Sequence, residues 1–335
     1  MTIGYVCHAE EAEMERIVVN NICYNLSGTE AKVVGDCVYE DGMGWCEGGG
    51  LLLLGRVPTR SSYYSENVII PETVHYKGEN YTVTSIESRV FDTSMYSCVN
   101  MTGQVPVSSV IIPKTVLSIE GGAFSGEHSL KAIKVHEDNP NYSSKDGVLY
   151  NKDKTILLCC PAGKEGNLTI PNSVKSIGDN AFSYSHLTGL TIPNSVTNIG
   201  EYVFDLSHIK SIIIPNSVTS IGKGAFHSSF VKSITIPNSV TYIGKDALYF
   251  CASLTHVYVN WDEPYEADYR IIEVVDDWVL AAFKGTCIGG EIISIEGVRG
   301  TGDENVIKLI VPPGKKSVYQ TSNTWKDLVV EERRE

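Results

Sequence analysis

Two histidines stand at matching positions of neighbouring copies of a repeated sequence, His186 and His208, which are 22 residues apart. Imidazole nitrogen atoms are common ligands of zinc, so two stacked copies could bring two such ligands together. The matching position of the next copy is Phe230, so the column offers no third ligand. We therefore expect two solvated histidines here, with no metal ion and no other cofactor.

A cluster of acidic and amide side chains could bind calcium, namely Asp138, Asn139, Asn141 and Asp146. Calcium prefers oxygen ligands of this kind, but the cluster lacks the spacing of a complete calcium-binding loop. Asp146 and Gly147 also lie between two strand-like runs, and this dipeptide favours a hairpin turn. We expect a turn at this position and no metal site.

No familiar catalytic motif is present in the chain. It contains neither the G-x-S-x-G nor the H-E-x-x-H pattern, and it has no phosphate-binding glycine loop. Residues 168–256 hold four acidic side chains, so a pair of catalytic carboxylates has little room there. An active site among the carboxylates of residues 262–277 is the remaining enzymatic alternative. We predict no catalytic residue and do not expect an enzyme.

The charge and hydropathy of the chain limit its partners. The 335 residues carry a formal net charge of −13, and 42% of them are hydrophobic. Nucleic acid repels such a chain unless a basic patch is present, and the sequence shows none. No apolar run reaches the length of a membrane-spanning helix. We expect no nucleic-acid partner and no membrane span.

The cysteines do not form a recognisable framework. There are nine of them, without the spacing of a zinc site. Cys159 and Cys160 are adjacent, which is too close for an ordinary disulfide. Most are expected to be small buried apolar residues, and a disulfide between Cys37 and Cys46 is an alternative for that pair.

A repeat of 22 residues organises the middle of the chain. Its four regular copies contain Pro171, Pro193, Pro215 and Pro237. The residues before each proline alternate between polar and apolar, as in Ser233-Ile234-Thr235-Ile236, which predicts a half-buried strand. Proline ends the strand because it has no N–H group to donate, and the Pro-Asn-Ser motif that follows favours a turn. Each copy is therefore expected to form one coil.

One such coil is too small to bury its own apolar face, but stacked coils bury a continuous core. The strands should pair in parallel at a spacing of about 4.8 Å. Matching residues then lie above one another. This arrangement predicts an apolar spine of Phe182, Phe204, Phe226 and Leu248, each delivered by a short helical turn. It also predicts an exposed ladder of Asn172, Asn194, Asn216 and Asn238.

The phrase IPNSVTSIG-x-x-AF resembles the BspA-like leucine-rich repeat, also called the type 5 or Treponema-like class. Residues 67–86, 136–160 and 309–328 also resemble segments of that family, and the likeness covers roughly residues 20–330. The resemblance implies a leucine-rich-repeat solenoid, an α/β-class superhelix that is strand-rich, with short helical or 3-10 turns. It implies a cell-surface or secreted protein of a host-associated microbe, adhesion in some members, and no catalytic residues.

The expected organisation has four parts. Residues 1–14 are a leader remnant or disordered start, since they resemble the end of a secretory signal. Residues 15–66 form an N-terminal β cap. Residues 67–260 form the solenoid, with an inserted hairpin at about 136–160. Residues 261–335 form an irregular C-terminal cap.

The outward-pointing strand residues are small, nearly uncharged and arranged in columns, which suits a broad contact better than catalysis. The candidate binding face consists of Lys134, Thr191, Ser211, Ile213, Ser233, Thr235, His256 and Tyr258. Good strand surface without a partner is an equal alternative. We expect a non-catalytic binding protein for host or microbial surface proteins or glycans. A carbohydrate-recognition module is the alternative, with Tyr63, Tyr64, Tyr258 or Trp261 stacking on sugar rings.

Overall fold

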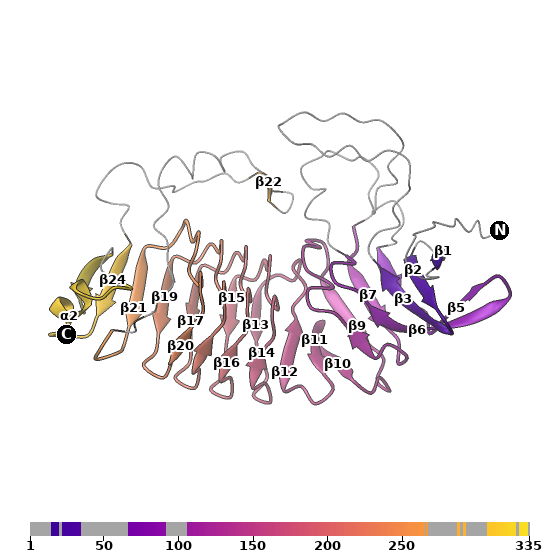
Figure 1. Ribbon diagram of the computed structural model, residues 1–335, viewed down its shortest axis with the longest axis horizontal. Helices are drawn as coiled ribbons and strands as arrows, with labels where there is room; N and C mark the ends of the chain where they lie inside the picture. The colour runs from indigo at the N-terminus through magenta and orange to yellow at the C-terminus, as the bar shows by residue number, and fades with distance from the viewer. Residues whose placement is uncertain are drawn as a thin grey trace.

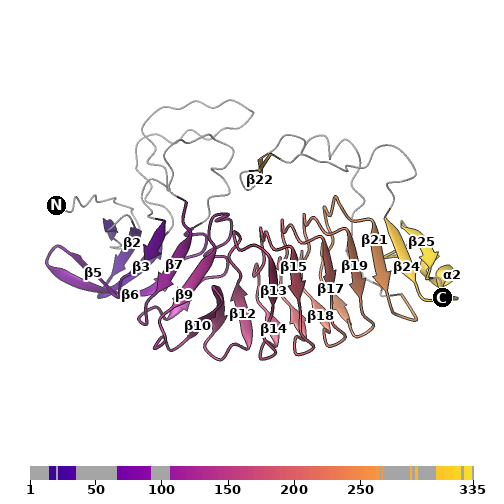
Figure 2. The ribbon, with the colours of Figure 1, turned by 180° about the vertical axis from the view of Figure 1, so that it is seen from behind.

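The computed structural model describes residues 15–19, 22–34, 66–91, 106–264, 266, 287–288, 291–292, 307–325 and 328–333. The described residues form an elongated stack of coils, with the N-terminal strands at one end and helix α2 at the other (Figures 1 and 2). Each regular coil contains a strand, a proline turn, a shorter strand and a run of linked turns.

The first strand of each coil contributes to one side of the stack, which we call the strand face. Its strands are β4 (Asn67–Ile69), β7 (Ser109–Ile112), β9 (Ala132–Val135), β13 (Asn167–Thr169), β15 (Gly189–Thr191), β17 (Ser211–Ile213), β19 (Ser233–Ile236), β21 (His256–Val259), β24 (Lys308–Val311) and β25 (Val329–Glu332). They pair in parallel as three separate sheets, β4-β7-β9, β13-β15 and β17-β19-β21-β24-β25. The predicted parallel stacking of strands is confirmed.

The burial pattern explains why these segments are strands. In β19, Ile234 and Ile236 point into the core, while Ser233 and Thr235 point outward. Pro237 then ends the strand, and its carbonyl oxygen accepts a hydrogen bond of 3.2 Å from the N–H of Val240. Alternation and proline thus fix both the register and the end of the strand.

The second strand of each coil lies in a separate sheet. This sheet has the order β10 (Tyr142–Lys145), β11 (Val148–Asn151), β12 (Ile156–Cys159), β14 (Ser176–Ile177), β16 (Asn198–Ile199), β18 (Ser220–Ile221) and β20 (Tyr242–Ile243). The pair β10–β11 is an antiparallel hairpin that turns at Asp146 and Gly147, both with positive φ. From β12 onward the pairing is parallel and unbroken.

The third side of the stack is a run of turns, where the sequence predicts a short helical turn. We call it the turn ladder, formed by residues 180–184, 202–206, 224–228 and 246–250. In these fully described segments there is no helix. The N–H groups of Phe182, Phe204 and Phe226 each donate to the next coil, at 2.9, 2.7 and 2.8 Å. In a helix, these N–H groups would donate to carbonyl groups of the same coil. Here they donate to the next coil instead, so no helix forms.

The apolar spine is confirmed. The rings of Phe182 and Phe204 stack with centroids 5.5 Å apart, and those of Phe204 and Phe226 with centroids 4.9 Å apart. Leu248 is buried in the same core cluster. Upstream, Phe91 and Phe124 stack in the same manner at 5.3 Å.

The four asparagines of the predicted ladder are exposed, but the hydrogen bonds between adjacent turns come from serine. Asn172, Asn194, Asn216 and Asn238 are all exposed. Between adjacent proline turns, the hydroxyl of Ser217 donates to the carbonyl oxygen of Val196 at 2.6 Å. The hydroxyl of Ser239 donates to that of Val218 at 2.8 Å. The serine side chain is half-buried against the preceding coil, whereas the asparagine points to solvent.

Adjacent coils approach most closely at a column of glycines, and this predicts the effect of adding one methyl group. A Cβ atom on Gly222 would overlap the backbone of Gly200 and Glu201. We expect Gly222→Ala to lower the free energy of unfolding by about 2 kcal/mol, since overpacking forces the backbone apart. Gly121→Ala is the control, because a Cβ atom there meets nothing within 4 Å. Equal urea-denaturation midpoints for both variants would contradict the close approach.

The N-terminal strands form a sheet of their own. It has the order β1 (Glu15–Val19), β2 (Ile22–Ser27), β3 (Glu30–Val34), β6 (Glu79–Ile86) and β5 (Thr73–Tyr76), and β8 (Ser118–Ile119) pairs with β6. Lys32 Nζ donates to Glu120 Oε1 at 2.6 Å, which joins the sheet to the following coil. This hydrogen bond lowers the pKa of Glu120 and raises the pKa of Lys32.

At the C-terminal end, aromatic side chains cover the last coil. Trp325 is fully buried, and its ring lies 6.3 Å from that of Trp261. Trp261 Nε1 donates to Val240 O at 3.0 Å, and the hydroxyl of Tyr319 donates to Trp261 O at 2.9 Å. Tyr319 belongs to helix α2 (Lys316–Gln320). The remaining described strands, β22 (Cys287–Ile288) and β23 (Glu291–Ile292), form an antiparallel pair.

Candidate binding face

The histidine column exists and is longer than the sequence indicates. The rings of His186 and His208 stack with centroids 4.7 Å apart, and Phe230 continues the column at 4.8 Å. On the other side, Nδ1 of His128 lies 3.3 Å from Nε2 of His186. The sequence does not place His128 in this column, because the inserted hairpin separates it from His186 by more than one repeat period. In the part of the chain that the structure describes, no three His, Cys, Asp or Glu side chains are grouped to hold a metal ion.

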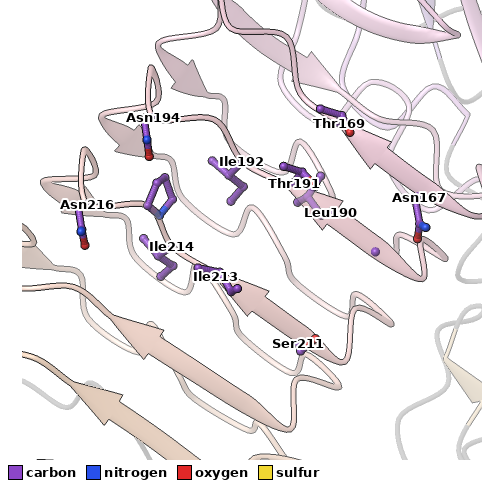
Figure 3. Close-up of a pocket in the computed structure, with 12 residues that line it drawn as sticks. Asn167, Thr169, Leu190, Thr191, Ile192, Asn194, Ser211, Ile213, Ile214 and Asn216 are labelled. Atoms are coloured by element: carbon purple, nitrogen blue, oxygen red, sulfur yellow. The ribbon is translucent and has the colours of Figure 1, made fainter.

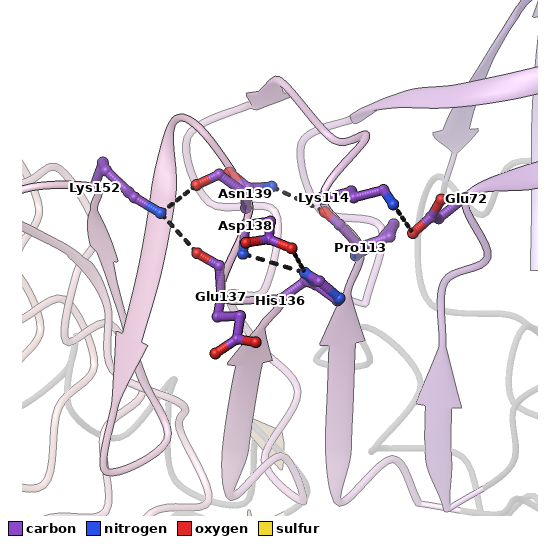
Figure 4. Close-up of polar contacts among 8 residues, drawn as sticks. All are labelled: Glu72, Pro113, Lys114, His136, Glu137, Asp138, Asn139 and Lys152. Carbon is purple, nitrogen blue, oxygen red and sulfur yellow. Dashed lines mark hydrogen bonds and ion pairs between the residues drawn. The ribbon is translucent and has the colours of Figure 1, made fainter.

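The cluster with calcium-type ligands is divided among separate roles (Figure 4). Asn139 is 0% exposed. Its Nδ2 donates to the carbonyl oxygens of Pro113 and Val116, at 2.9 and 2.8 Å. Its Oδ1 accepts from the N–H groups of Asn141 and Tyr142, at 3.0 and 2.8 Å. Asn139 is therefore a structural brace whose hydrogen-bonding groups are occupied.

Its neighbours have other partners. The carboxylate of Asp138 lies 3.9 Å from Nδ1 of His136, and Nδ2 of Asn141 donates to the carbonyl oxygen of Leu117 at 2.7 Å. Lys152 Nζ donates to the carbonyl oxygens of Glu137 and Asn139, which fastens the hairpin to the loop (Figure 4). The cluster stabilises a junction between coils.

Two of the described cysteines, Cys160 and Cys251, are core residues. Cys160 is buried, and burial raises the pKa of its thiol to about 12. Cys251 is also buried, and its thiol donates to the carbonyl oxygen of Phe226 at 2.9 Å. Neither forms a disulfide bond within the described residues. Cys37 and Cys46 lie outside the described residues.

Six of the eight candidate residues occupy three adjacent paired strands. In β17, β19 and β21 the register aligns Ser211, Ser233 and His256 as one column. It aligns Ile213, Thr235 and Tyr258 as the other. Thr191 lies on the neighbouring strand β15, and Lys134 lies farther away in β9 of another sheet. The structure therefore brings seven candidates together around β15–β21 and leaves Lys134 apart.

The middle of the strand face carries no formal charge. None of the outward residues of β13, β15, β17, β19 and β21 is Asp, Glu, Lys or Arg. The most exposed apolar side chain of this region is Ile213, at 78%. Charge returns beyond β21, where Lys308 and Glu331 form an ion pair of 3.0 Å. A neutral surface with one projecting aliphatic side chain stands out in a chain with a net charge of −13.

A depression of about 760 Å³ lies between β15 and β17, and we call it the slot (Figure 3). These two strands belong to different sheets, although their coils are adjacent in sequence. The slot is lined by Asn167, Thr169, Gly189, Leu190, Thr191, Ile192, Asn194, Ser211, Ile213, Ile214, Pro215 and Asn216. Sequence reasoning missed it because the copies on both sides have the same length and the same motif.

The residues expected to stack on sugars have different outcomes. Trp261 is only 8% exposed, so that prediction is wrong, because the ring is packed under Tyr319 and beside Trp325. Tyr63 and Tyr64 lie outside the described residues. Tyr258 remains on the strand face, where its ring lies 6.0 Å from that of His256 at an interplanar angle of 14°.

The family comparison agrees with this architecture. Residues 97–146 and 163–263 match the BspA type leucine rich repeat region in six copies. The repeats of this chain are BspA-type leucine-rich repeats, and the fold is a strand-rich leucine-rich-repeat solenoid. This repeat class is consistent with a protein-binding role. None of the helices that the structure describes is long and apolar enough to cross a membrane.

Several solved structures are similar to the chain. A leucine-rich repeat protein from Eubacterium ventriosum has 29% identity and a TM-score of 0.48, over 58% of this chain and 48% of that one. The chain thus spans about half the length of that protein. The pneumococcal vaccine antigen PcpA has 16% identity and a TM-score of 0.45, over 95% and 99% of the two chains. A leucine rich cell surface protein from Faecalibacterium prausnitzii has 19% identity and a TM-score of 0.36, over 98% of this chain and 97% of that one. No curated protein matches the chain.

Proposed function

We propose that this chain is a non-catalytic binding protein, secreted or displayed on a microbial cell surface, which contacts host or microbial surface proteins through its strand face. The observation that carries the proposal is the pair of aligned, uncharged columns on β17, β19 and β21. The repeat class and the structurally similar cell surface protein from Faecalibacterium prausnitzii support the proposal that the chain is secreted or displayed on the cell surface. Adhesion to matrix proteins or to other cells is the role that we infer.

The physical argument starts from the repeating geometry. Each coil adds two outward side chains at a fixed spacing, so the face grows into a broad contact area without a deep active-site cleft. Contact energy in such areas concentrates on aromatic and large aliphatic anchors. Ile213, His256 and Tyr258 are the side chains of this kind within the two columns.

The test is binding of the purified chain to an array of matrix glycoproteins and microbial surface proteins. Replacing Ile213, His256 and Tyr258 together by serine should abolish saturable binding. A matched control replaces three exposed apolar residues elsewhere, Leu117, Ile156 and Tyr242. Equal loss of binding in both variants, or no binding by the parent chain, would count against the proposal.

A carbohydrate-recognition role is a second candidate. The rings of His256 and Tyr258 are nearly parallel and stacked, and a sugar ring could stack on an outer face of this pair. Saturable binding to a glycan array that is lost in Tyr258→Ala and retained in Ile213→Ser would favour this role over protein contact.

A further inference from the structure

The described strand face has two interruptions, one between β9 and β13, where the inserted hairpin intervenes, and one between β15 and β17, where the other two sides of the stack are continuous. Between β15 and β17 the structure has no strand pairing, whereas β17 pairs with β19 residue by residue. The corresponding short strands, β16 and β18, are paired. The turn ladder is also intact, with Tyr184 N–H donating to Asp205 O at 2.8 Å. Two sides therefore hold the coils together while the third stays open as the slot.

A local feature of the sequence shapes the lining of the slot. Gly189 occupies the column position that Ser211 and Ser233 occupy in the next coils. A Cβ atom on Gly189 would overlap the side-chain amide of Asn167, whose Oδ1 accepts a hydrogen bond of 3.2 Å from the hydroxyl of Thr188. The missing side chain thus leaves room for the Asn167 amide, which lines the slot together with the projecting Ile213.

The lining of the slot specifies the chemistry of an occupant. Its aliphatic part consists of Leu190, Ile192, Ile213 and Ile214, and the rest consists of amide and hydroxyl side chains with Gly189 and Pro215. The facing edges of β15 and β17 add backbone N–H and C=O groups that no strand partner occupies. Such edges bind an extended peptide through its main chain, with pockets that accept its side chains.

We infer that the slot holds a neutral peptide segment of a protein partner, with one aliphatic side chain inserted between β15 and β17 and its main-chain amides bonded to their edges. This inference rests on the proposed function and names the part of the face that selects the partner. The slot has no charged residue to attract an ionic ligand, and no aromatic ring on which a sugar could stack.

The repeat offers a matched pair of variants to test this. Ser211 is exposed and lines the slot, whereas Ile69 is an exposed outward residue of β4 that lies outside the slot and outside the candidate binding face. Tyrosine is well tolerated on an outward strand position, so Ser211→Tyr should cover the slot without unfolding the coil. Ile69→Tyr places the same ring on β4, which belongs to another sheet of the strand face. Circular dichroism and the urea midpoint of both variants should match those of the parent.

The probe is a phage library of short random linear peptides, selected on the full chain and followed by titration of the enriched synthetic peptides. We expect neutral sequences with a Leu, Ile or Val anchor. Their dissociation constants should rise roughly tenfold or more in Ser211→Tyr and stay within about twofold in Ile69→Tyr. Amide hydrogen exchange should be faster in β15 and the start of β17 than in β19, and the peptide should slow it.

The outcomes separate this inference from the proposed function. If protein partners bind and require Tyr258, but Ser211→Tyr has no effect, the slot is not the selecting site and the function stands. Enrichment of charged peptides, or equal loss of affinity in both tyrosine variants, overturns the inference as well. If Ser211→Tyr instead removes binding of neutral oligosaccharides, the occupant is a glycan and the peptide assignment is wrong. Failure of the parent chain to bind any protein or peptide overturns both.

Discussion

Phe204→Ala should lower the free energy of unfolding by about 3–5 kcal/mol, the range for removing a fully buried aromatic ring. Phe204 is the central ring of the spine, stacked on both sides by Phe182 and Phe226 at 5.5 and 4.9 Å. Its loss leaves a cavity that neighbouring coils cannot fill, because hydrogen bonds along the short-strand sheet and the turn ladder fix their spacing. Urea denaturation followed by circular dichroism measures the change.

The control for this variant is Lys210→Ala in the same coil, since Lys210 is exposed. We expect a change within about 0.5 kcal/mol there. A similar small change for Phe204→Ala would mean that the ring does not support its neighbours. A broadened transition in Phe204→Ala would indicate that the coils on either side unfold separately, as weakened repeat stacks can.

Asn139→Leu should cost at least about 3 kcal/mol, because buried polar groups left without partners each cost about 1–3 kcal/mol. The substitution removes two donated hydrogen bonds, which join the loop after β9 to the preceding turn, and two accepted hydrogen bonds from Asn141 and Tyr142 that shape the loop itself. The two carbonyl groups and two N–H groups would then lose this buried partner.

Asn139→Asp separates the donor role from packing, since it has nearly the same shape. It keeps acceptors for Asn141 and Tyr142 but places an oxygen atom against the carbonyl oxygens of Pro113 and Val116. We expect destabilisation comparable to that of Asn139→Leu. Asn172→Leu is the control, because Asn172 is exposed in a proline turn. Thermal unfolding of the three variants provides the comparison. If Asn139→Asp were as stable as the parent chain, Asn139 would not be a structural brace.

Most of the fold could be predicted from the period of the repeat and from the alternation of polar and apolar residues within it. A fixed period places Phe182, Phe204 and Phe226 in one column whatever the coil geometry is, and the alternation in β19 decides which side is buried. The same logic predicted the register of Ser211 with Ser233 and of Thr235 with Tyr258. Period and alternation are local properties, so one sequence is sufficient to read them.

The parts that could not be predicted depend on contacts between coils. The turn ladder differs from a helical turn only in where each N–H group points, which no residue type specifies. The slot arises between two copies with the same motif. The sequence signal for it was Gly189, which stands where the next copies have serine, and this signal was not interpreted. Asn139 looked like a metal ligand because its partners, Pro113 and Val116, belong to the previous coil.

The turn ladder also gives the stack a direction. Its inter-coil hydrogen bonds run from the N–H groups of one coil to the carbonyl groups of the next coil toward the C-terminus, as at Asn180, Tyr202 and Gly224. Peptide dipoles on this side therefore add up along the axis, with the positive end toward the C-terminus, opposite to an α-helix. Two such stacks could continue the ladder head to tail but could never meet through it about a twofold axis. Self-association that continued this ladder would thus give an open filament and not a closed dimer.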